Sequence, residues 1–218
     1  SDLAEFIQYL SNQFPNRPLY AIGFSLGGNI LAKYLGEYSD SKLTGSVVIS
    51  APFELEECAN SVNQGFSKLY QRYLVKRLQN SALNKLSRHP EMSELLIDES
   101  LIKNIDSLIE FDDKYTAPIN DFDSGKDYYQ QSSCRQFLKH IQTPTLILHA
   151  KDDPFMNETV IPTEQELSDN VTLELSEKGG HVGFLSGANP LKPEFWLETR
   201  SVEFIQSIIE QSAKSKQL

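Results

Sequence analysis

The spacing of hydrophobic and polar residues along the 218-residue chain predicts helices that alternate with strands. Apolar residues that recur every three or four positions predict helices, whereas short apolar or alternating runs predict strands. Strands are expected at 18–24, 43–50, 144–150 and 171–176, and helices around them at 2–14, 26–37, 157–168 and 194–211. Strands and helices in this order favour an α/β fold with a mostly parallel sheet and flanking helices.

The segment 51–142 departs from this order, because it contains helical patterns and polar turns but no strong strand pattern. Helices are expected there at 56–80 and 99–110. The first of these helices has an apolar stripe made of Phe66, Leu69, Tyr70, Tyr73 and Leu74. The stripe is typical either of ordinary core packing or of an apolar acyl pocket.

The most specific motif is Gly-Phe-Ser-Leu-Gly-Gly at 23–28, between a predicted strand and a predicted helix. This is the context of a G-x-S-x-G nucleophile elbow, which holds a serine in a strained turn at the N-terminus of a helix. We expect Gly23 and Gly27 to be required, because a Cβ at either position would collide with the neighbouring strand or helix. The alternative is a glycine-rich turn in which Ser25 is idle.

A nucleophilic serine needs a base and an orienting carboxylate, and in this type of elbow protein they follow in the order Ser, Asp or Glu, His. Asp152 and Asp153 come directly after the strand at 144–150. The turn before Pro154 favours Asp153 as the orienting acid, which leaves Asp152 as a cap or salt-bridge partner. His181 lies in a glycine-rich loop after the last predicted strand and is the candidate base.

The other three histidines fit this role less well. His149 lies inside a predicted strand and is expected to be a packed strand residue. His89 and His140 lie in helical or cap-like sequence and are expected to be solvated or locally hydrogen-bonded.

Composition narrows the partners and the compartment. A net charge of −10 and a pI near 4.9 argue against nucleic acid or an anionic membrane surface as the main partner. The two cysteines, Cys58 and Cys134, are too few for a disulfide framework and predict reduced thiols in the cytoplasm.

The sequence contains no metal-ligand cluster, phosphate loop or dinucleotide motif, so no cofactor is expected. It shows no stretch apolar enough for stable membrane insertion. It shows no obvious cluster of Arg or Lys that would clamp a charged substrate, which favours an uncharged one.

Taken together, the motifs resemble the YheT-like branch of the α/β-hydrolases, which is similar to medium-chain fatty-acid ethyl ester synthases and esterases. The resemblance is carried by Gly-Phe-Ser-Leu-Gly-Gly-Asn at 23–29, Ser-Ala-Pro-Phe at 50–53, Phe-Asp-Asp at 111–113, Thr-Ala-Pro at 116–118, Tyr-Tyr at 128–129, Ser-Ser at 132–133, Asp-Asp-Pro-Phe-Met at 152–156 and Gly-Gly-His-Val-Gly-Phe at 179–184.

This resemblance implies a carboxylic ester hydrolase with Ser25 as nucleophile, Asp153 as orienting acid and His181 as general base. The backbone N–H of Leu26 would supply half of the oxyanion hole. The segment at about 51–142 would be a helical cap. Transfer of the acyl group to an alcohol, or an idle binding or scaffold role, would use the same fold.

The chain departs from the family at its start. Only 24 residues precede Ser25, and they contain no His-Gly motif, which usually marks the loop with the first oxyanion donor. We therefore expect residues 1–218 to be the C-terminal part of one α/β-hydrolase domain, whose missing N-terminal part is the chain's partner. Without that part, one edge of the strand at 18–24 would face water.

Overall fold

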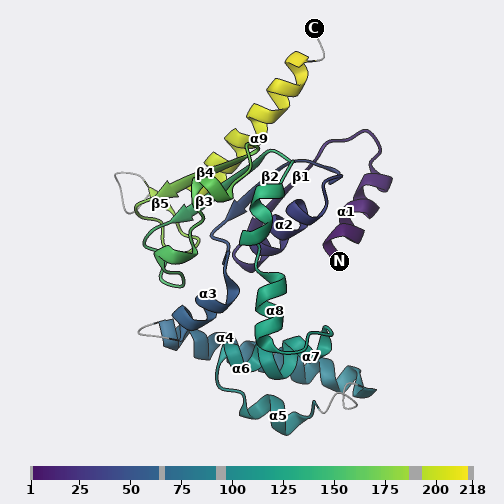
Figure 1. Ribbon diagram of the computed structural model, residues 1–218, viewed down its shortest axis with the longest axis vertical. Helices are drawn as coiled ribbons and strands as arrows, with labels where there is room; N and C mark the ends of the chain where they lie inside the picture. The colour runs from purple at the N-terminus through teal and green to yellow at the C-terminus, as the bar shows by residue number, and fades with distance from the viewer. Residues whose placement is uncertain (1, 64–66, 92–96, 187–192, 216–218) are drawn as a thin grey trace. The chain divides into compact units, whose positions relative to one another are not determined.

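The computed structural model describes residues 2–63, 67–91, 97–186 and 193–215, and they form two compact units (Figure 1). Unit 1 comprises Ser1–Phe53, Ser133–Asp153 and Glu158–Leu218. Unit 2 comprises Glu54–Ser132 and Pro154–Asn157. Unit 2 therefore falls largely within the segment 51–142 that lacks a strand pattern in the sequence.

Unit 1 is built on a four-stranded parallel sheet in the order β1 (Leu19–Phe24), β2 (Leu43–Ile49), β3 (Thr145–Ala150) and β4 (Val171–Ser176). All four predicted strands are confirmed. Phe24 pairs with Ile49, and Ile49 pairs with Leu148, so the strands reach the same edge of the sheet together. The loops that follow the strands consequently start from one edge, where open α/β sheets bind ligands.

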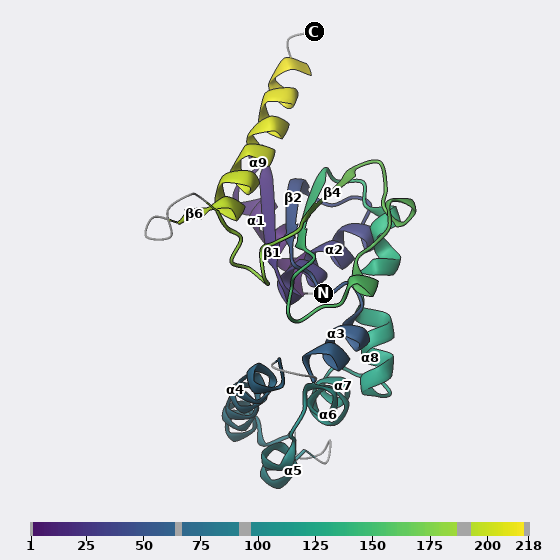
Figure 2. The same ribbon diagram turned by 90° about the vertical axis from the view of Figure 1, so that its left-hand side faces the viewer.

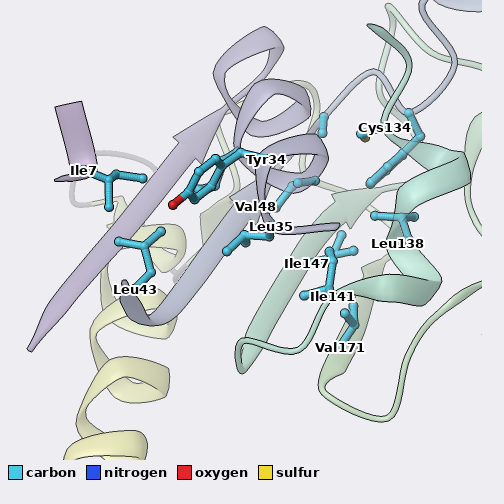
Figure 3. Close-up of a cluster of buried hydrophobic side chains, with 14 residues drawn as sticks. Ile7, Tyr34, Leu35, Leu43, Val48, Cys134, Leu138, Ile141, Ile147 and Val171 are labelled. Atoms are coloured by element: carbon cyan, nitrogen blue, oxygen red, sulfur yellow. The ribbon is translucent and has the colours of Figure 1, made fainter. Parts of the chain in front are cut away.

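Alternating side chains of the strands build two cores, one on each face of the sheet. On one face, Val48 and Ile147 pack with α1 (Asp2–Gln13), α2 (Leu26–Glu37) and the 3₁₀ helix η3 (Arg135–His140) (Figure 3). On the other face, Val47 and Leu146 pack with α9 (Trp196–Ser215) through Leu197. Each fully buried aliphatic side chain of this kind stabilises the fold by about 1.5–3 kcal/mol.

The helix predicted at 157–168 is wrong. This segment forms two 3₁₀ turns, η4 (Glu158–Val160) and η5 (Glu164–Glu166), with Pro162 between them. Proline lacks a backbone N–H and disfavours helical geometry at the residue before it, so a continuous α-helix cannot pass. Arg135 fixes the second turn by donating from Nε and Nη2 to the two carboxylate oxygens of Glu166 over 2.7 and 2.9 Å.

Past β4, the chain of unit 1 forms a short antiparallel pair, β5 (Leu185–Ser186) and β6 (Glu194–Phe195), before α9. The helices predicted at 2–14, 26–37 and 194–211 are confirmed as α1, α2 and α9, and α9 extends to Ser215. Among the described residues, no helix is both long enough and apolar enough to span a lipid bilayer.

Unit 2 is helical, and its described residues contain no strand (Figure 2). Its elements are α3 (Leu55–Val62), α4 (Ser67–Arg88), α5 (Glu99–Asn104), α6 (Leu108–Phe111), the π-helical turn η2 (Asp112–Thr116), α7 (Ala117–Ile119) and α8 (Gly125–Ser132). The single helix expected at 56–80 is two helices, α3 and α4, and α4 continues to Arg88.

The helix expected at 99–110 is also two helices. Asp98 caps α5 by accepting a hydrogen bond from the Leu101 N–H over 2.7 Å. Ser107 caps α6 in the same way, with its Oγ accepting from the Glu110 N–H over 3.2 Å. Serine and aspartate favour helix starts over helix interiors, which explains the break after Asn104.

The apolar stripe expected along α4 does not form the core of unit 2. Leu69, Tyr70 and Tyr73 are 64%, 41% and 55% exposed, whereas Val75 and Ala82 are buried against α5 and α6. The core-packing interpretation of the stripe is therefore wrong for these three residues, and Phe66 lies outside the described residues.

Candidate active site

Ser25 lies in the turn that joins β1 to α2, at the carboxyl edge of the sheet. Its φ of 50° and ψ of −125° are strained for a residue with a side chain. The backbone is fixed on both sides. The Ser25 N–H donates to the Ile49 carbonyl over 2.8 Å, and the Ser25 carbonyl accepts from the N–H groups of Gly28 and Asn29. The turn therefore presents the hydroxyl of Ser25 at the N-terminus of α2.

The glycines of the motif contribute unequally to this turn. A Cβ on Gly23 would lie 2.6 Å from the Gly27 carbonyl oxygen, which is a severe clash with backbone. A Cβ on Gly28 would lie 3.1 Å from the Gly23 oxygen and 3.2 Å from the Cβ of Ala51. A Cβ on Gly27 would meet nothing within 4 Å, so the expectation that Gly27 avoids a collision is wrong. Close packing of the strand and the helix requires Gly23 and tightly confines Gly28.

The structure brings His181 and Asp153 to Ser25 in one hydrogen-bonded series. His181 Nε2 lies 2.8 Å from Ser25 Oγ, and His181 Nδ1 lies 2.8 Å from Asp153 Oδ2. The side chain of Asp153 is completely buried, and that of His181 is 15% exposed. The imidazole is therefore placed between a buried carboxylate and a hydroxyl at the sheet edge, which is the arrangement that activates a serine.

Asp152 has a different partner from Asp153. Its Oδ1 accepts hydrogen bonds from the backbone N–H groups of Gly179 and Gly180, each over 2.8 Å. Gly180 has a φ of 59°, which favours glycine, and it precedes His181 directly. Asp152 thus holds the loop that carries His181, in agreement with the capping role expected for it.

His149 is a packed strand residue, as the sequence predicts, and lies next to this site at the end of β3. It is 1% exposed and contacts the ring of Phe53, with 5.8 Å between the ring centroids. Burial lowers the pKa of His149, and the charge of Asp153 acts in the opposite direction. Burial therefore favours the neutral form of this imidazole. His89 and His140 are exposed, also as the sequence predicts.

Ser50 is a feature of this edge that the sequence did not reveal. It follows β2, has a φ of 48° and is completely buried. Among the described residues, its hydroxyl and Nδ1 of His149 have no hydrogen-bond partner. In the sequence, Ser50 is marked by its place at a strand end and as the first residue of Ser-Ala-Pro-Phe at 50–53, but neither feature reveals its positive φ or its burial.

The backbone N–H of Leu26 is the first of α2, a position whose amide has no acceptor within its own helix. The helix dipole adds partial positive charge at the same place. This amide is therefore suited to stabilise negative charge that develops beside Ser25 Oγ. Within the described residues, no group of three or more His, Cys, Asp or Glu side chains is placed to hold a metal ion.

The parallel sheet, the strained serine turn and the Ser-His-Asp geometry define an α/β hydrolase. The family model of the alpha/beta hydrolase fold matches residues 1–188, and the chain belongs to this family. The predicted fold class is therefore confirmed, and the predicted resemblance is confirmed by the relatives that follow.

The chain is 42% identical over 210 residues to "Putative esterase YheT" of Escherichia coli (strain K12). It is 34% identical over 192 residues to "Monoacylglycerol lipase" of Saccharomyces cerevisiae. These matches cover 96% and 84% of this chain, but the chain spans only 61% and 42% of the two relatives.

Solved structures share the fold at low sequence identity. An alpha/beta fold family hydrolase from Bacillus anthracis str. Sterne matches with a TM-score of 0.51 and 17% identity, over 95% of this chain and 73% of that one. The Pyrococcus furiosus esterase Pf2001 matches with a TM-score of 0.50 and 15% identity, over 94% of this chain and 60% of that one. At such identities the likeness concerns the fold alone.

Proposed function

We propose that the protein is a serine hydrolase that cleaves carboxylic esters through an acyl-enzyme intermediate. The observation that carries this proposal is the hydrogen-bonded series of Ser25, His181 and Asp153, with 2.8 Å at each step. The names of the relatives, an esterase and a monoacylglycerol lipase, support esters as the substrate class.

In this mechanism, His181 Nε2 takes the proton of Ser25 as Oγ attacks the ester carbonyl carbon. The tetrahedral intermediate collapses, the C–O bond of the ester breaks, and the proton passes from His181 to the departing alcohol. Water then attacks the acyl-enzyme with His181 again as base, which releases the acid and regenerates Ser25. Asp153 holds the imidazole in the required tautomer and stabilises its charged form.

The oxyanion hole has the Leu26 N–H as one donor in this proposal. We propose that the second donor comes from a further segment of the same domain that pairs with β1. β1 is the edge strand of the described sheet, and its side chains Ile22 and Phe24 are 42% and 50% exposed. Exposed edges with apolar side chains promote association with another strand.

The expected behaviour of residues 1–218 on their own follows from that open edge. This segment should be poorly soluble, and it should lose about 10²–10³ in kcat for want of one oxyanion donor. A monodisperse monomer of 24.7 kDa with the same kcat as a longer polypeptide that includes the segment would contradict the proposed pairing.

The nucleophile is tested with a fluorophosphonate probe, which should label Ser25 alone. Ser25→Ala should abolish labelling and lower kcat for p-nitrophenyl esters by roughly 10⁴–10⁶. Ser50→Ala is the matched control, because Ser50 also follows a strand with a positive φ but has a buried hydroxyl. Unchanged turnover in Ser25→Ala would refute Ser25 as the nucleophile, whereas no turnover in the unchanged protein would favour the idle binding role.

The substrate proposed is an ester with a short to medium acyl chain. In a series of p-nitrophenyl esters, kcat/KM should rise up to about fourfold per added CH₂, since each buried CH₂ contributes about 0.8 kcal/mol, and then fall when the pocket is full. A preference for acetyl esters would count against an apolar pocket. Formation of an ethyl ester in ethanol at the expense of free acid would show acyl transfer instead of hydrolysis.

The cytoplasmic location stays a prediction.

A further inference from the structure

Helix α4 has a charge opposite to that of the whole protein. The chain has 30 acidic and 20 basic residues and a net charge of −10. The 22 residues of α4 contain no Asp or Glu, and they contain six basic residues: Lys68, Arg72, Lys76, Arg77, Lys85 and Arg88. The net charge of the chain therefore conceals a locally cationic helix within unit 2.

Three of these residues line one groove within unit 2. Lys68, Arg72 and Lys76 are four residues apart, so they lie on the same side of the helix. The groove has a volume of about 580 Å³, and Asn63, Gln79 and Ser107 add polar groups to its walls. Asp106 is the acidic residue among its described lining residues. Three cations against one anion make the groove suited to a phosphate group.

An apolar stripe runs beside these cations on the outer side of α4. It consists of Leu69, Tyr70 and Tyr73, which are 64%, 41% and 55% exposed. Leu69 and Tyr73 each follow a residue of the groove in sequence, which places the stripe about 100° around the helix from the cations. The cations and the stripe therefore lie side by side.

Packing within unit 2 fixes the rotation of α4 about its own axis. The opposite side of α4 is buried, and Val75 and Ala82 belong to a core with α5 and α6. Buried Gln71 donates from Nε2 to Asn63 Oδ1 over 3.0 Å. Tyr70 stacks on Phe155 with 4.5 Å between the ring centroids. The helix thus cannot turn its exposed apolar side inward without losing these contacts.

A basic groove with an exposed leucine and tyrosines beside it has the chemistry of a helix that lies in a lipid interface. Lys and Arg attract anionic headgroups, whereas leucine enters the acyl boundary and tyrosine lies at headgroup level. Nucleic acid also attracts cations and stacks on aromatic rings, but it offers an exposed aliphatic side chain such as Leu69 no comparable partner.

We propose that α4 binds an anionic phospholipid surface. Lys68, Arg72 and Lys76 hold lipid phosphate in the groove, and Leu69 and Tyr73 enter the interface. This binding does not require the hydrolytic chemistry, although it would bring the enzyme to a surface that holds acyl esters if the proposed function is right.

The test is sedimentation of the protein with vesicles of phosphatidylcholine and phosphatidylglycerol at 3:1, compared with phosphatidylcholine alone. The protein should bind the anionic vesicles, and binding should weaken as salt is raised, because salt screens exposed charges. The triple variant Lys68→Gln/Arg72→Gln/Lys76→Gln should bind about 100-fold more weakly, since each basic residue near an anionic surface contributes about fivefold.

The matched control is Lys42→Gln/Lys126→Gln/Lys139→Gln, which removes the same charge at three exposed lysines outside α4. It should bind the anionic vesicles within about threefold of the unchanged protein if the site is local. Leu69→Ser/Tyr73→Ser should also weaken binding, and this loss should persist at high salt because it concerns apolar contacts.

Several outcomes would overturn the proposal. These are equal binding to both kinds of vesicle, equal losses in the two triple variants, displacement from vesicles by millimolar inorganic phosphate, or tighter binding to an RNA oligonucleotide through the same three residues. Ser25→Ala should bind vesicles like the unchanged protein, so failure of the hydrolase proposal and failure of the lipid proposal are distinguishable.

Discussion

Replacement of Asp153 by asparagine should disable the enzyme while leaving its fold intact. Asp153 Oδ2 lies 2.8 Å from His181 Nδ1, and its side chain is completely buried, so water cannot replace the lost charge. If the NH₂ group of asparagine faces Nδ1, it favours the wrong tautomer of His181. If the amide oxygen faces Nδ1, it carries no charge to stabilise the imidazolium. We expect kcat to fall about 10⁴-fold, or roughly 5.5 kcal/mol of transition-state stabilisation.

The adjacent residue provides the control for this experiment. Asp152 is exposed, and its Oδ1 accepts from the N–H groups of Gly179 and Gly180. In Asp152→Asn the amide oxygen still accepts both bonds without the charge, so kcat should fall less than about tenfold. Both variants should have far-UV circular dichroism like that of the unchanged protein.

The assay is the hydrolysis of p-nitrophenyl butyrate under saturating conditions, with the protein concentration taken from absorbance. A 10⁴-fold loss in Asp152→Asn, with Asp153→Asn nearly unaffected, would exchange the roles of the two carboxylates. Small losses in both variants would refute the argument that a buried carboxylate orients His181.

Two further predictions concern packing and pH. Gly23→Ala should destabilise the protein by about 2 kcal/mol or more, because the new Cβ would lie 2.6 Å from the Gly27 oxygen. The control Gly27→Ala should destabilise it by less than about 0.5 kcal/mol, because a Cβ there meets nothing within 4 Å. Equal melting temperatures of the two variants would contradict this prediction. Burial raises the pKa of Asp112 from its ordinary value of 3.8, and the hydrogen bond from Tyr129 acts in the opposite direction. A raised pKa in the folded state gives stability that is present at low pH and is lost as pH rises through that pKa. The melting temperature should therefore fall relative to Asp112→Asn as the pH rises above about 3.8, and parallel curves would contradict a raised pKa of Asp112.

The sequence predicts the parts of the fold that depend on local pattern. All four parallel strands, the serine turn and the position of Asp153 within hydrogen-bond distance of His181 follow from short motifs, because hydrophobic periodicity, glycine and proline act over a few residues. The role of Asp153 as the orienting acid stays a prediction. The prediction of a helix at 157–168 is wrong for a reason that the sequence itself contains, because Pro162 interrupts the helical pattern.

Other features depend on tertiary structure and could not be predicted in this way. The apolar stripe of α4 is exposed because the helix packs against α5 and α6 with its other side, which contains Val75 and Ala82. The open space beside Gly27 depends on the angle between β1 and α2, which a short sequence motif does not specify. The basic residues of α4 can be read from the sequence, but the groove that they line with Asn63 and Ser107 depends on how α4 packs in unit 2.

Ser25 and Ser50 show why strain alone does not identify a nucleophile. Each serine directly follows a strand, each has a φ near 50°, and each donates its N–H to a carbonyl of the neighbouring strand, Ile49 for Ser25 and Leu148 for Ser50. The sheet edge thus repeats the same backbone geometry at two adjacent strand ends. Only Ser25 has its hydroxyl 2.8 Å from His181 Nε2, while the hydroxyl of Ser50 is buried without a partner among the described residues. The loop that carries His181 therefore distinguishes Ser25 from Ser50, and backbone strain does not. Asp152 holds that loop without a hydrogen bond to Ser25 or His181 among those that the structure describes.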